Sequence, residues 1–181
     1  MVGEGAKLDE VLTRILHAVC TVMSCEAASV LLLDSRKRNL IFQAAIGQKG
    51  AKIKGITLPR NIGIAGAVLE NGSAIICEDP TEDPRFCEAL DNTIGFITRS
   101  IIYVPLIIDN ERVGVLEGVN KISKKTFSDN DLQVFISFAD ISAAAVHNAK
   151  ANELLIRKNK ALQRKLDEYL KTSSKNSKIT H

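Results

Sequence analysis

The pattern of apolar and polar positions predicts a helix followed by a β-hairpin at the start of the chain. Apolar residues recur at three- and four-residue steps over residues 6–24, as in one face of an amphipathic helix: Leu8, Val11, Leu12, Ile15, Leu16, Val19 and Met23. Two short apolar runs follow, Ala28–Leu33 and Leu40–Ile46. Because the polar segment Arg36–Asn39 separates them, we expect an antiparallel hairpin.

A glycine-containing helix is expected in the middle of the chain. Gly63–Leu69 predicts this helix, with Asn61 as its N-cap and Asn71-Gly72 as its end. Its two glycines indicate close backbone approach, which a ligand or a strand would explain. Three short segments surround it, and we expect a loop over Gln48–Lys54, a strand over Ile56–Leu58 and a strand over Ser73–Cys77.

The next segment, Glu78–Asn92, is acidic and contains two prolines, so we expect an irregular stretch with a short helix near Arg85–Leu90. Two further strands are predicted at Ser100–Ile108 and Arg112–Val119, because the turn-forming pair Asp109-Asn110 separates two apolar runs.

The final predicted element is a long helix that Ser128 or Asp129 can cap. Mostly antiparallel strands with helices on the faces of the sheet define an α+β fold. No Gly or Pro occurs between Ser128 and His181, so nothing in the sequence ends this helix where the core ends.

The continuation of the helix carries a heptad pattern. Leu155, Leu162 and Tyr169 repeat at seven residues, and Leu166 takes the matching four-residue offset. Asn152 and Asn159 take the equivalent earlier offsets, where a buried Asn fixes register. We expect a homodimeric coiled coil over residues 150–171; the alternative is a solvated helical tail. Residues 172–181, rich in Ser and Lys, predict a flexible linker.

Charge and composition narrow the function classes. From Lys150 onward the chain contains nine Lys and Arg residues and three acidic residues, whereas residues 1–149 contain 15 basic and 18 acidic side chains. The chain has no Trp, and its basic character lies in the tail, so we expect no direct binding of nucleic acid. No apolar run approaches the roughly 20 residues that span a bilayer. We therefore expect a cytoplasmic protein with no membrane anchor, whose four cysteines are reduced.

No catalytic or metal-binding constellation emerges. His17, His147 and His181 have no Cys, Asp or Glu at metal-ligand spacing. Gly63–Gly66 is too short for a phosphate-binding loop and lacks the Lys-Ser/Thr that would follow it. We expect no enzymatic activity, no metal and no resident cofactor.

Six segments together resemble a GAF domain, the small-molecule sensory fold of cyclic-nucleotide phosphodiesterases, cyanobacterial adenylyl cyclases and many bacterial regulators. The segments are Ala28–Asp34, Gly63–Gly66, Asp79–Arg85, Thr93–Ile101, Val104–Leu106 and Gly114–Lys121. The resemblance implies a GAF fold over residues 1–149, with a long signalling helix after it.

A signature of the cyclic-nucleotide-binding members, Asn-Lys followed by Phe and Asp-Glu, is also present in part. Asn120, Lys121, Phe127 and Asp131 match it, and Leu132 stands where the final Glu would be. The resemblance implies that Lys121 pairs with Asp131 beneath the pocket and acts as a structural latch rather than touching ligand. An Asp in the first turn of a helix also suits the helix dipole.

The resemblance further implies a set of ligand-binding residues. They are Ser29 on the first strand, Ile64 and Ala65 at the start of the glycine-containing helix, and Asp91, Thr93 and Thr98 in the lid-like segment. The amides that open the helix would suit a phosphate or carboxylate. The cysteines and histidines do not match the patterns of bilin-binding, haem-binding or methionine-sulfoxide-reducing members.

These features predict a regulatory domain that senses a small molecule, with cyclic AMP or cyclic GMP as first candidate. A dimeric terminal helix would pass the signal to an attached output domain beyond His181, because a ligand shifts an equilibrium by its differential affinity. One alternative is a sensor of another metabolite, such as a 2-oxo acid, in a sigma-54-dependent nitrogen-fixation-type transcription activator. A second is a ligand-free dimerisation module.

Overall fold

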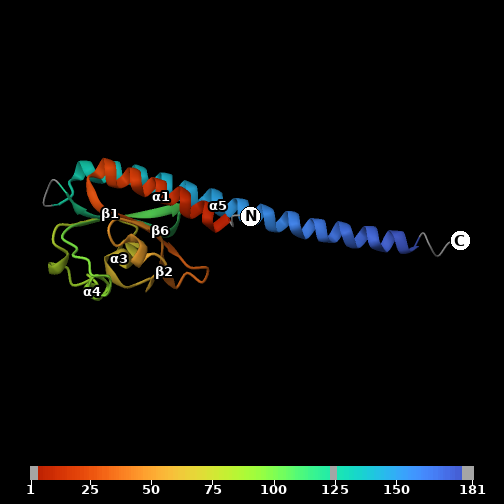
Figure 1. Cartoon of the computed structure of the whole chain (residues 1–181), viewed down its shortest axis with the longest axis horizontal. Coiled ribbons are helices and arrows are strands. Elements are labelled where there is room, and N and C mark those ends of the chain that lie inside the picture. The colour runs from red at the N-terminus through yellow and green to blue at the C-terminus, as the bar shows by residue number, and fades with distance from the viewer. Residues whose placement is uncertain (1–3, 123–125, 177–181) are drawn as a thin grey trace. The chain divides into compact units, whose positions relative to one another are not determined.

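A six-stranded antiparallel sheet forms the centre of the first part of the chain, residues 1–146 (Figure 1). The computed structural model describes residues 4–122 and 126–176. The strand order is β3-β2-β1-β6-β5-β4. The strands are β1 (Cys25–Leu33), β2 (Asn39–Ile46), β3 (Thr57–Pro59), β4 (Ile75–Cys77), β5 (Ile101–Ile108) and β6 (Glu111–Lys121). The helices are α1 (Glu4–Met23), α2 (Gly50–Ile53), α3 (Gly63–Asn71), α4 (Glu88–Ile94) and α5 (Asp129–Asn176), with a 3-10 turn η1 (Pro80–Glu82).

Two hairpins build the sheet, and both were predicted from the sequence. β1 pairs with β2, and β5 pairs with β6, each antiparallel. Asp109 and Asn110 connect the second pair with φ angles of 50° and 63°. Asp and Asn tolerate this left-handed conformation better than other residues, and it matches the twist of a two-residue hairpin turn. The α+β class is confirmed.

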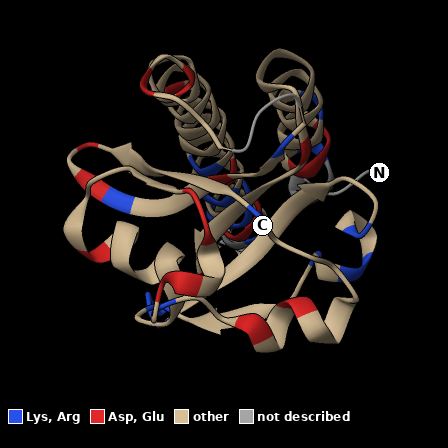
Figure 2. Cartoon of the chain, turned by 90° about the vertical axis from the view of Figure 1, so that its left-hand side faces the viewer, with Lys and Arg blue, Asp and Glu red and all other residues tan. Residues whose placement is uncertain are grey.

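One face of the sheet is covered by α1 and by the first part of α5 (Figures 1 and 2). The predicted apolar stripe of α1 faces this layer, with Leu12, Leu16 and Val19 fully buried. Phe135 and Val146 of α5 are equally buried in the same core. Side chains therefore alternate along β1, with Val30 and Leu32 on this face and Ser29 and Leu31 on the other.

The opposite face packs against α3 and the smaller elements around it. Its core joins Leu31 and Phe42 of the sheet to Ile64, Val68 and Leu69 of α3. Leu58 and Leu90 pack around its edge. Since α2, α3 and α4 are short, they cover this face less completely than long helices would, and the candidate site lies there.

Two local predictions were wrong. Residues Gln48–Lys54 contain a short helix, α2, in place of the expected loop, because buried Gly50 starts a turn against β2. Asn61 does not cap α3; its N-cap is Ile62, with no side-chain hydrogen bond. The predicted end of α3 is confirmed, since Gly72 is its C-cap with φ +71°.

The final helix begins as predicted at the Ser128 and Asp129 pair. The Ser128 hydroxyl accepts a hydrogen bond from the Asp131 N–H at 3.3 Å, and the Asp131 carboxylate accepts one from the Ser128 N–H at 2.8 Å. This reciprocal arrangement satisfies the free N–H groups at the helix start.

The chain divides into two compact units, residues 1–146 and 147–181. Within the second unit, the helix continues to Asn176, past position 172 where the sequence predicts a flexible linker, because no Gly or Pro interrupts it. The rest of that predicted linker, residues 177–181, lies outside the described residues. Among the helices described, none is long and apolar enough to cross a membrane.

Candidate functional site

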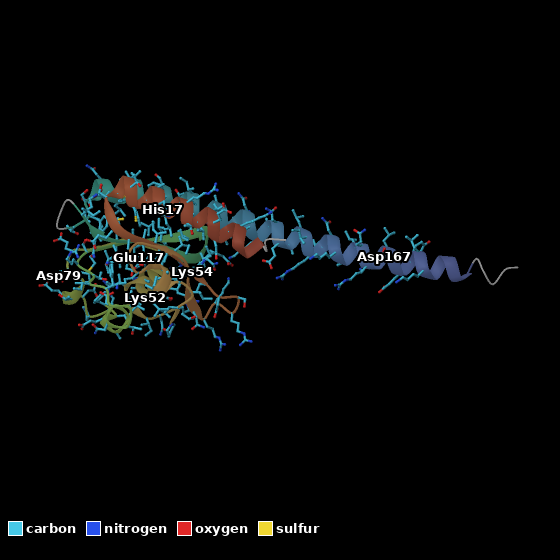
Figure 3. All side chains as sticks on the ribbon, in the orientation of Figure 1. His17, Lys52, Lys54, Asp79, Glu117 and Asp167 are labelled. Atoms are coloured by element: carbon cyan, nitrogen blue, oxygen red, sulfur yellow. The ribbon has the colours of Figure 1, made fainter. Side chains whose placement is uncertain are left out.

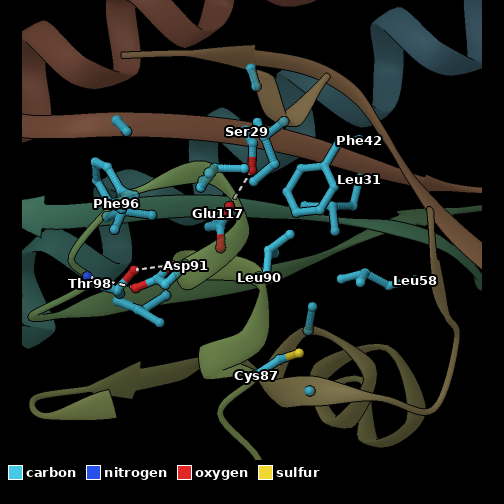
Figure 4. Close-up of a pocket in the computed structure, with 18 of the residues that line it drawn as sticks. Ser29, Leu31, Phe42, Leu58, Cys87, Leu90, Asp91, Phe96, Thr98 and Glu117 are labelled. Carbon is cyan, nitrogen blue, oxygen red and sulfur yellow. Dashed lines mark hydrogen bonds between the residues drawn. The ribbon is translucent and has the colours of Figure 1, made fainter. Parts of the chain in front are cut away.

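A pocket lies between the sheet and the short helices α3 and α4 (Figure 4). Its cavity volume, taken as the space open to the centre of a water-sized sphere, is about 80 Å³. Most of its wall is apolar and comes from separate segments of the chain: Leu31, Phe42, Leu58, Leu90 and Phe96. A few polar groups converge among them, which is the usual composition of a small-molecule site.

Three polar side chains meet on the floor of the pocket. Ser29, Glu117 and Tyr103 lie directly opposite one another on β1, β6 and β5. The Ser29 hydroxyl donates a hydrogen bond to one Glu117 oxygen, and the Tyr103 hydroxyl donates to the other at 2.5 Å. Glu117 is only 9% exposed, whereas Lys52 and Lys54 are exposed; Figure 3 labels these three residues.

The environment of this triad raises the pKa of both of its acidic groups, Glu117 and Tyr103. Burial raises the pKa of Glu117, and this effect outweighs the hydrogen bonds from Ser29 and Tyr103, which act to lower it. Burial likewise raises the pKa of Tyr103 well above its ordinary value, so its hydroxyl keeps its proton. The floor is therefore a buried group in which both Glu117 oxygens accept hydrogen bonds from hydroxyls.

A second pair of polar side chains lies at the two ends of residues 91–98, which we call the lid segment. Asp91 of α4 accepts hydrogen bonds from the Thr98 N–H at 2.8 Å and from the Thr98 hydroxyl at 2.9 Å (Figure 4). Both residues line the pocket, and Thr98 is buried. The pair ties the end of the lid segment to α4, so a ligand that contacts Asp91 also contacts this segment.

The start of α3 forms another part of the wall. Ile64 and Ala65 are buried and line the pocket, and Gly63 precedes them with φ +79°. The first N–H groups of a helix lack partners within it and suit an anion. Close approach at Gly66 has a different cause from a ligand, because a Cβ there would lie 2.8 Å from the Asn61 carbonyl carbon.

The structure brings five of the six predicted ligand-binding residues together around the pocket: Ser29, Ile64, Ala65, Asp91 and Thr98. It does not bring Thr93 there. Thr93 is exposed on α4, and its hydroxyl donates to the Ala89 carbonyl at 2.7 Å within the same helix. The ligand contacts of the five remain predictions.

Sequence reasoning missed Glu117, Tyr103 and Lys49, which also line the pocket. Glu117 stands alone in the apolar run Val115–Val119, and a single carboxyl inside a predicted strand was the available signal. Lys49 is the one cation among the described residues of the lining, and it comes from the segment that was predicted as a loop.

The predicted latch lies at the end of β6. Asn120 is buried with φ +59°, and its side chain joins three segments. Its amide oxygen accepts a hydrogen bond from the Arg99 N–H at 2.7 Å, and its amide nitrogen donates to Glu26 at 2.8 Å and to the Ile97 carbonyl at 2.9 Å. Asn120 thus fixes the chain directly after the lid.

The pairing of Lys121 with Asp131 is confirmed. The Lys121 ammonium lies 2.7 Å from the Asp131 carboxylate and donates to the Met23 carbonyl at 2.7 Å, so it connects α1 with α5. Its charge also lies 5.7 Å from the centre of the Phe127 ring. Burial alone raises the pKa of Asp131, but hydrogen bonds from Lys121 and Ser128 exceed that effect and hold its pKa below the ordinary value.

The charges described so far do not form a metal site or a basic surface. Across residues 4–122 and 126–176, no group of three or more His, Cys, Asp or Glu is arranged to hold a metal ion. In Figure 2 the ribbon segments of basic residues and those of acidic residues are both spread over several elements. The pocket is the feature with the composition of a binding site.

The sequence matches a known protein family, and that family agrees with the architecture described above. The model of the family described as "GAF domain" matches residues 5–147. The chain is 28% identical over 159 residues to the "Probable 3',5'-cyclic phosphodiesterase pde-5" of Caenorhabditis elegans, covering 83% of this chain and 22% of that protein. It is 29% identical over 138 residues to the "Cone cGMP-specific 3',5'-cyclic phosphodiesterase subunit alpha'" of Mus musculus, covering 75% and 16%. The chain therefore spans about a fifth of the curated relatives it matches.

Solved structures agree on the fold. The GAF domain of a phosphoenolpyruvate-protein phosphotransferase from Coxiella burnetii has a TM-score of 0.73 at 20% identity, over 81% of this chain and 86% of that one. A free methionine-R-sulfoxide reductase from Neisseria meningitidis has a TM-score of 0.67 at 18% identity, over 80% and 81%. At such identities these likenesses show the GAF fold, which the sequence predicted, and nothing about activity.

Proposed function

The chain belongs to the GAF domain family, and we propose that it is a cytoplasmic sensor whose pocket binds a purine cyclic nucleotide, cyclic AMP or cyclic GMP. GAF domains are regulatory modules that bind small molecules, and they are typically not catalytic. The observation that carries the proposal is the apolar pocket with its two polar centres, Glu117 with its hydroxyl partners and Asp91 with Thr98.

The lining offers a complementary group to each part of a cyclic nucleotide. A purine is flat and largely apolar on its faces, which suits a wall that includes Phe42 and Leu90. The carboxylate of Asp91 and the floor hydroxyls suit the hydrogen-bonding edges of a base and a ribose. The anionic phosphate suits the amides that open α3 and the ammonium of Lys49.

The curated relatives support the same ligand class, because both are named as cyclic phosphodiesterases and one as cGMP-specific. Leu132, in the first turn of α5, stands where the signature has its final Glu, and it packs partly buried against the core. Since Lys121 already pairs with Asp131, the substitution removes a carboxyl without leaving the lysine unpaired.

The signal is proposed to leave through helices. Lys121 holds both the end of α1 and the start of α5, so a ligand that alters the lid or the end of β6 biases the helical layer. Within the second unit, Leu155, Leu162 and Tyr169 are 58%, 64% and 71% exposed. These apolar side chains repeat every seven residues and are exposed to solvent. This pattern favours a homodimeric coiled coil that leads to an attached output domain.

Calorimetry of the full chain with cyclic AMP and with cyclic GMP tests the proposal. We expect a dissociation constant of about 1 μM or tighter for at least one of them. Thr98→Ala removes a hydroxyl that supports Asp91 in the pocket and is expected to weaken binding about tenfold, whereas Thr93→Ala, exposed on the same segment, is the matched control and leaves binding unchanged. Flat titrations with both nucleotides would eliminate this ligand.

A second candidate is a sensor of another anionic metabolite, such as a 2-oxo acid, in a sigma-54-dependent transcription activator. Lys49 favours it, because an ammonium in the pocket suits a carboxylate as well as a phosphate. The sequence that the gene encodes after position 181 distinguishes the two candidates. An AAA+ ATPase domain there would favour the transcription activator, and a cyclase or phosphodiesterase domain would favour the nucleotide sensor. The pocket between the sheet and α4 does not favour a ligand-free dimerisation module.

A further inference from the structure

Two cysteines lie close together on the face of the sheet opposite the pocket. Cys20 is near the end of α1, and Cys25 is the first residue of β1. Their sulfur atoms are 3.7 Å apart, with the Cys25 thiol donating to the Cys20 sulfur, and neither is in a disulfide. Cys25 is only 3% exposed, whereas Cys20 is half-buried, so a small reagent reaches Cys20 first.

The two thiols differ in accessibility and in the direction in which their surroundings shift the pKa. The hydrogen bond from Cys25 lowers the pKa of the Cys20 thiol, against the opposing effect of burial. That hydrogen bond and burial together raise the pKa of the Cys25 thiol well above its ordinary value. The thiolate is the reactive form of cysteine, and Cys20 is also the more accessible of the two thiols, so the first step is assigned to Cys20 and the second to Cys25.

We propose that Cys20 and Cys25 form an oxidisable dithiol, a modification site that takes a peroxide as its oxidant and closes to an intramolecular disulfide. The closeness of the two sulfur atoms and the unequal access to them carry this proposal, and it is independent of what the pocket binds.

The reaction balances as a two-electron oxidation. The Cys20 thiolate attacks one peroxide oxygen, the O–O bond breaks, and the leaving hydroxide takes a proton to become water, which gives Cys20 sulfenic acid. The Cys25 sulfur then attacks the Cys20 sulfur as its proton is lost, and the sulfenic hydroxyl leaves as a second water. Two thiols and one hydrogen peroxide thus give one disulfide and two waters.

The surroundings of the two cysteines show which contacts a disulfide between them would alter. A disulfide brings its sulfur atoms to about 2.05 Å, so the end of α1 and the start of β1 must adjust from the present 3.7 Å. Ser24 connects the two elements with φ +47°, and the neighbouring Met23 carbonyl accepts the hydrogen bond from Lys121. Cys25 itself is paired with Lys121 across the sheet. The dithiol is therefore adjacent to the Lys121 contacts.

Peptide mapping of the full chain tests the proposal. The protein is treated with a small excess of hydrogen peroxide, remaining thiols are blocked with N-ethylmaleimide, and trypsin then releases one peptide, Ile15–Arg36, that holds both cysteines. Cyanogen bromide cleaves after Met23, between them, and buried Met23 is shielded from peroxide. We expect the two halves to stay joined until a reductant is added.

Cys77 and Cys87 are internal controls, because trypsin places them on separate peptides. We expect both to react with the maleimide after a peroxide dose that closes the Cys20–Cys25 bridge. Cys25→Ser should leave a sulfenic acid at Cys20 that dimedone traps, and Cys20→Ser should slow the loss of the Cys25 thiol about tenfold or more. Separated halves, a bridge between two chains, or earlier oxidation of Cys77 or Cys87 would each overturn the proposal.

Discussion

Replacing Lys121 by Met tests whether its ion pair holds the helical layer together. The substitution keeps an unbranched apolar side chain but removes the ammonium and its two 2.7 Å contacts, with the Asp131 carboxylate and the Met23 carbonyl. The Lys121 and Asp131 side chains are only 8% and 17% exposed. Hydrogen bonds to charged groups contribute about 1.5–3 kcal/mol each, and breaking a buried pair costs about 3–5 kcal/mol. Because Ser128 still binds Asp131 and water reaches the site, we expect a loss of about 3 kcal/mol.

Urea unfolding of the full chain, followed by circular dichroism, measures this loss. Lys37→Met is the matched control, since Lys37 also lies 2.7 Å from a carboxylate, that of Glu111, but the two side chains are 60% and 64% exposed. An exposed pair contributes about 0–1 kcal/mol. A loss of 3 kcal/mol also corresponds to a fall in Tm of about 6–12 °C for a chain of this size.

A difference of under about 1 kcal/mol between Lys121→Met and Lys37→Met would refute the argument. Asp131→Asn, alone and combined with Lys121→Met, separates the ion pair from the contact with Met23, because only the pair appears as a coupling energy in the double-mutant cycle. The pKa of Asp131 is held below its usual value, so its contribution is present above the unfolded-state pKa and is lost as pH falls through the native one.

Three further variants test other parts of the structure. The raised pKa of Glu117 means that the native state binds its proton more tightly, so stability falls as pH rises from the unfolded-state pKa through the native one; Glu117→Gln should remove this fall in urea titrations at several pH values. Gly66→Ala should destabilise the domain by about 1–3 kcal/mol through its clash with backbone, against about 1 kcal/mol for Gly55→Ala, which meets no neighbour. Asn159→Leu should strengthen association in sedimentation experiments if the seam pairs two chains.

Long, strongly patterned elements could be predicted from the sequence. The apolar stripe of α1 was read from its periodicity, and the hairpin turn at Asp109-Asn110 was read from residues that tolerate positive φ. Gly72 was read as the end of α3 for the same reason. In each case a local property of the chain determines the structure, so no knowledge of distant contacts was required.

Elements that depend on distant contacts were missed. The four-residue helix α2 is too short to be stable by itself, and Gly50 is held where a Cβ would come 2.8 Å from the Ala45 carbonyl oxygen of β2. Lys49 reaches the pocket only because this turn forms. Glu117 was missed because its role depends on register, which places it between Ser29 and Tyr103 on neighbouring strands.

Strand β6 is the element that connects the parts of the molecule with distinct chemistry. Its middle carries Glu117 into the pocket on one face, while the adjacent Leu116 packs into the helical layer on the other. Its last residues, Asn120 and Lys121, hold the lid segment and the helix ends. A ligand that displaced β6 at Glu117 would therefore act on the same strand that holds Lys121, whose pair with Asp131 joins β6 to the start of α5. Under the proposed sensor role, loss of the Lys121 ammonium should therefore uncouple α5 from the pocket even where the pocket stays intact.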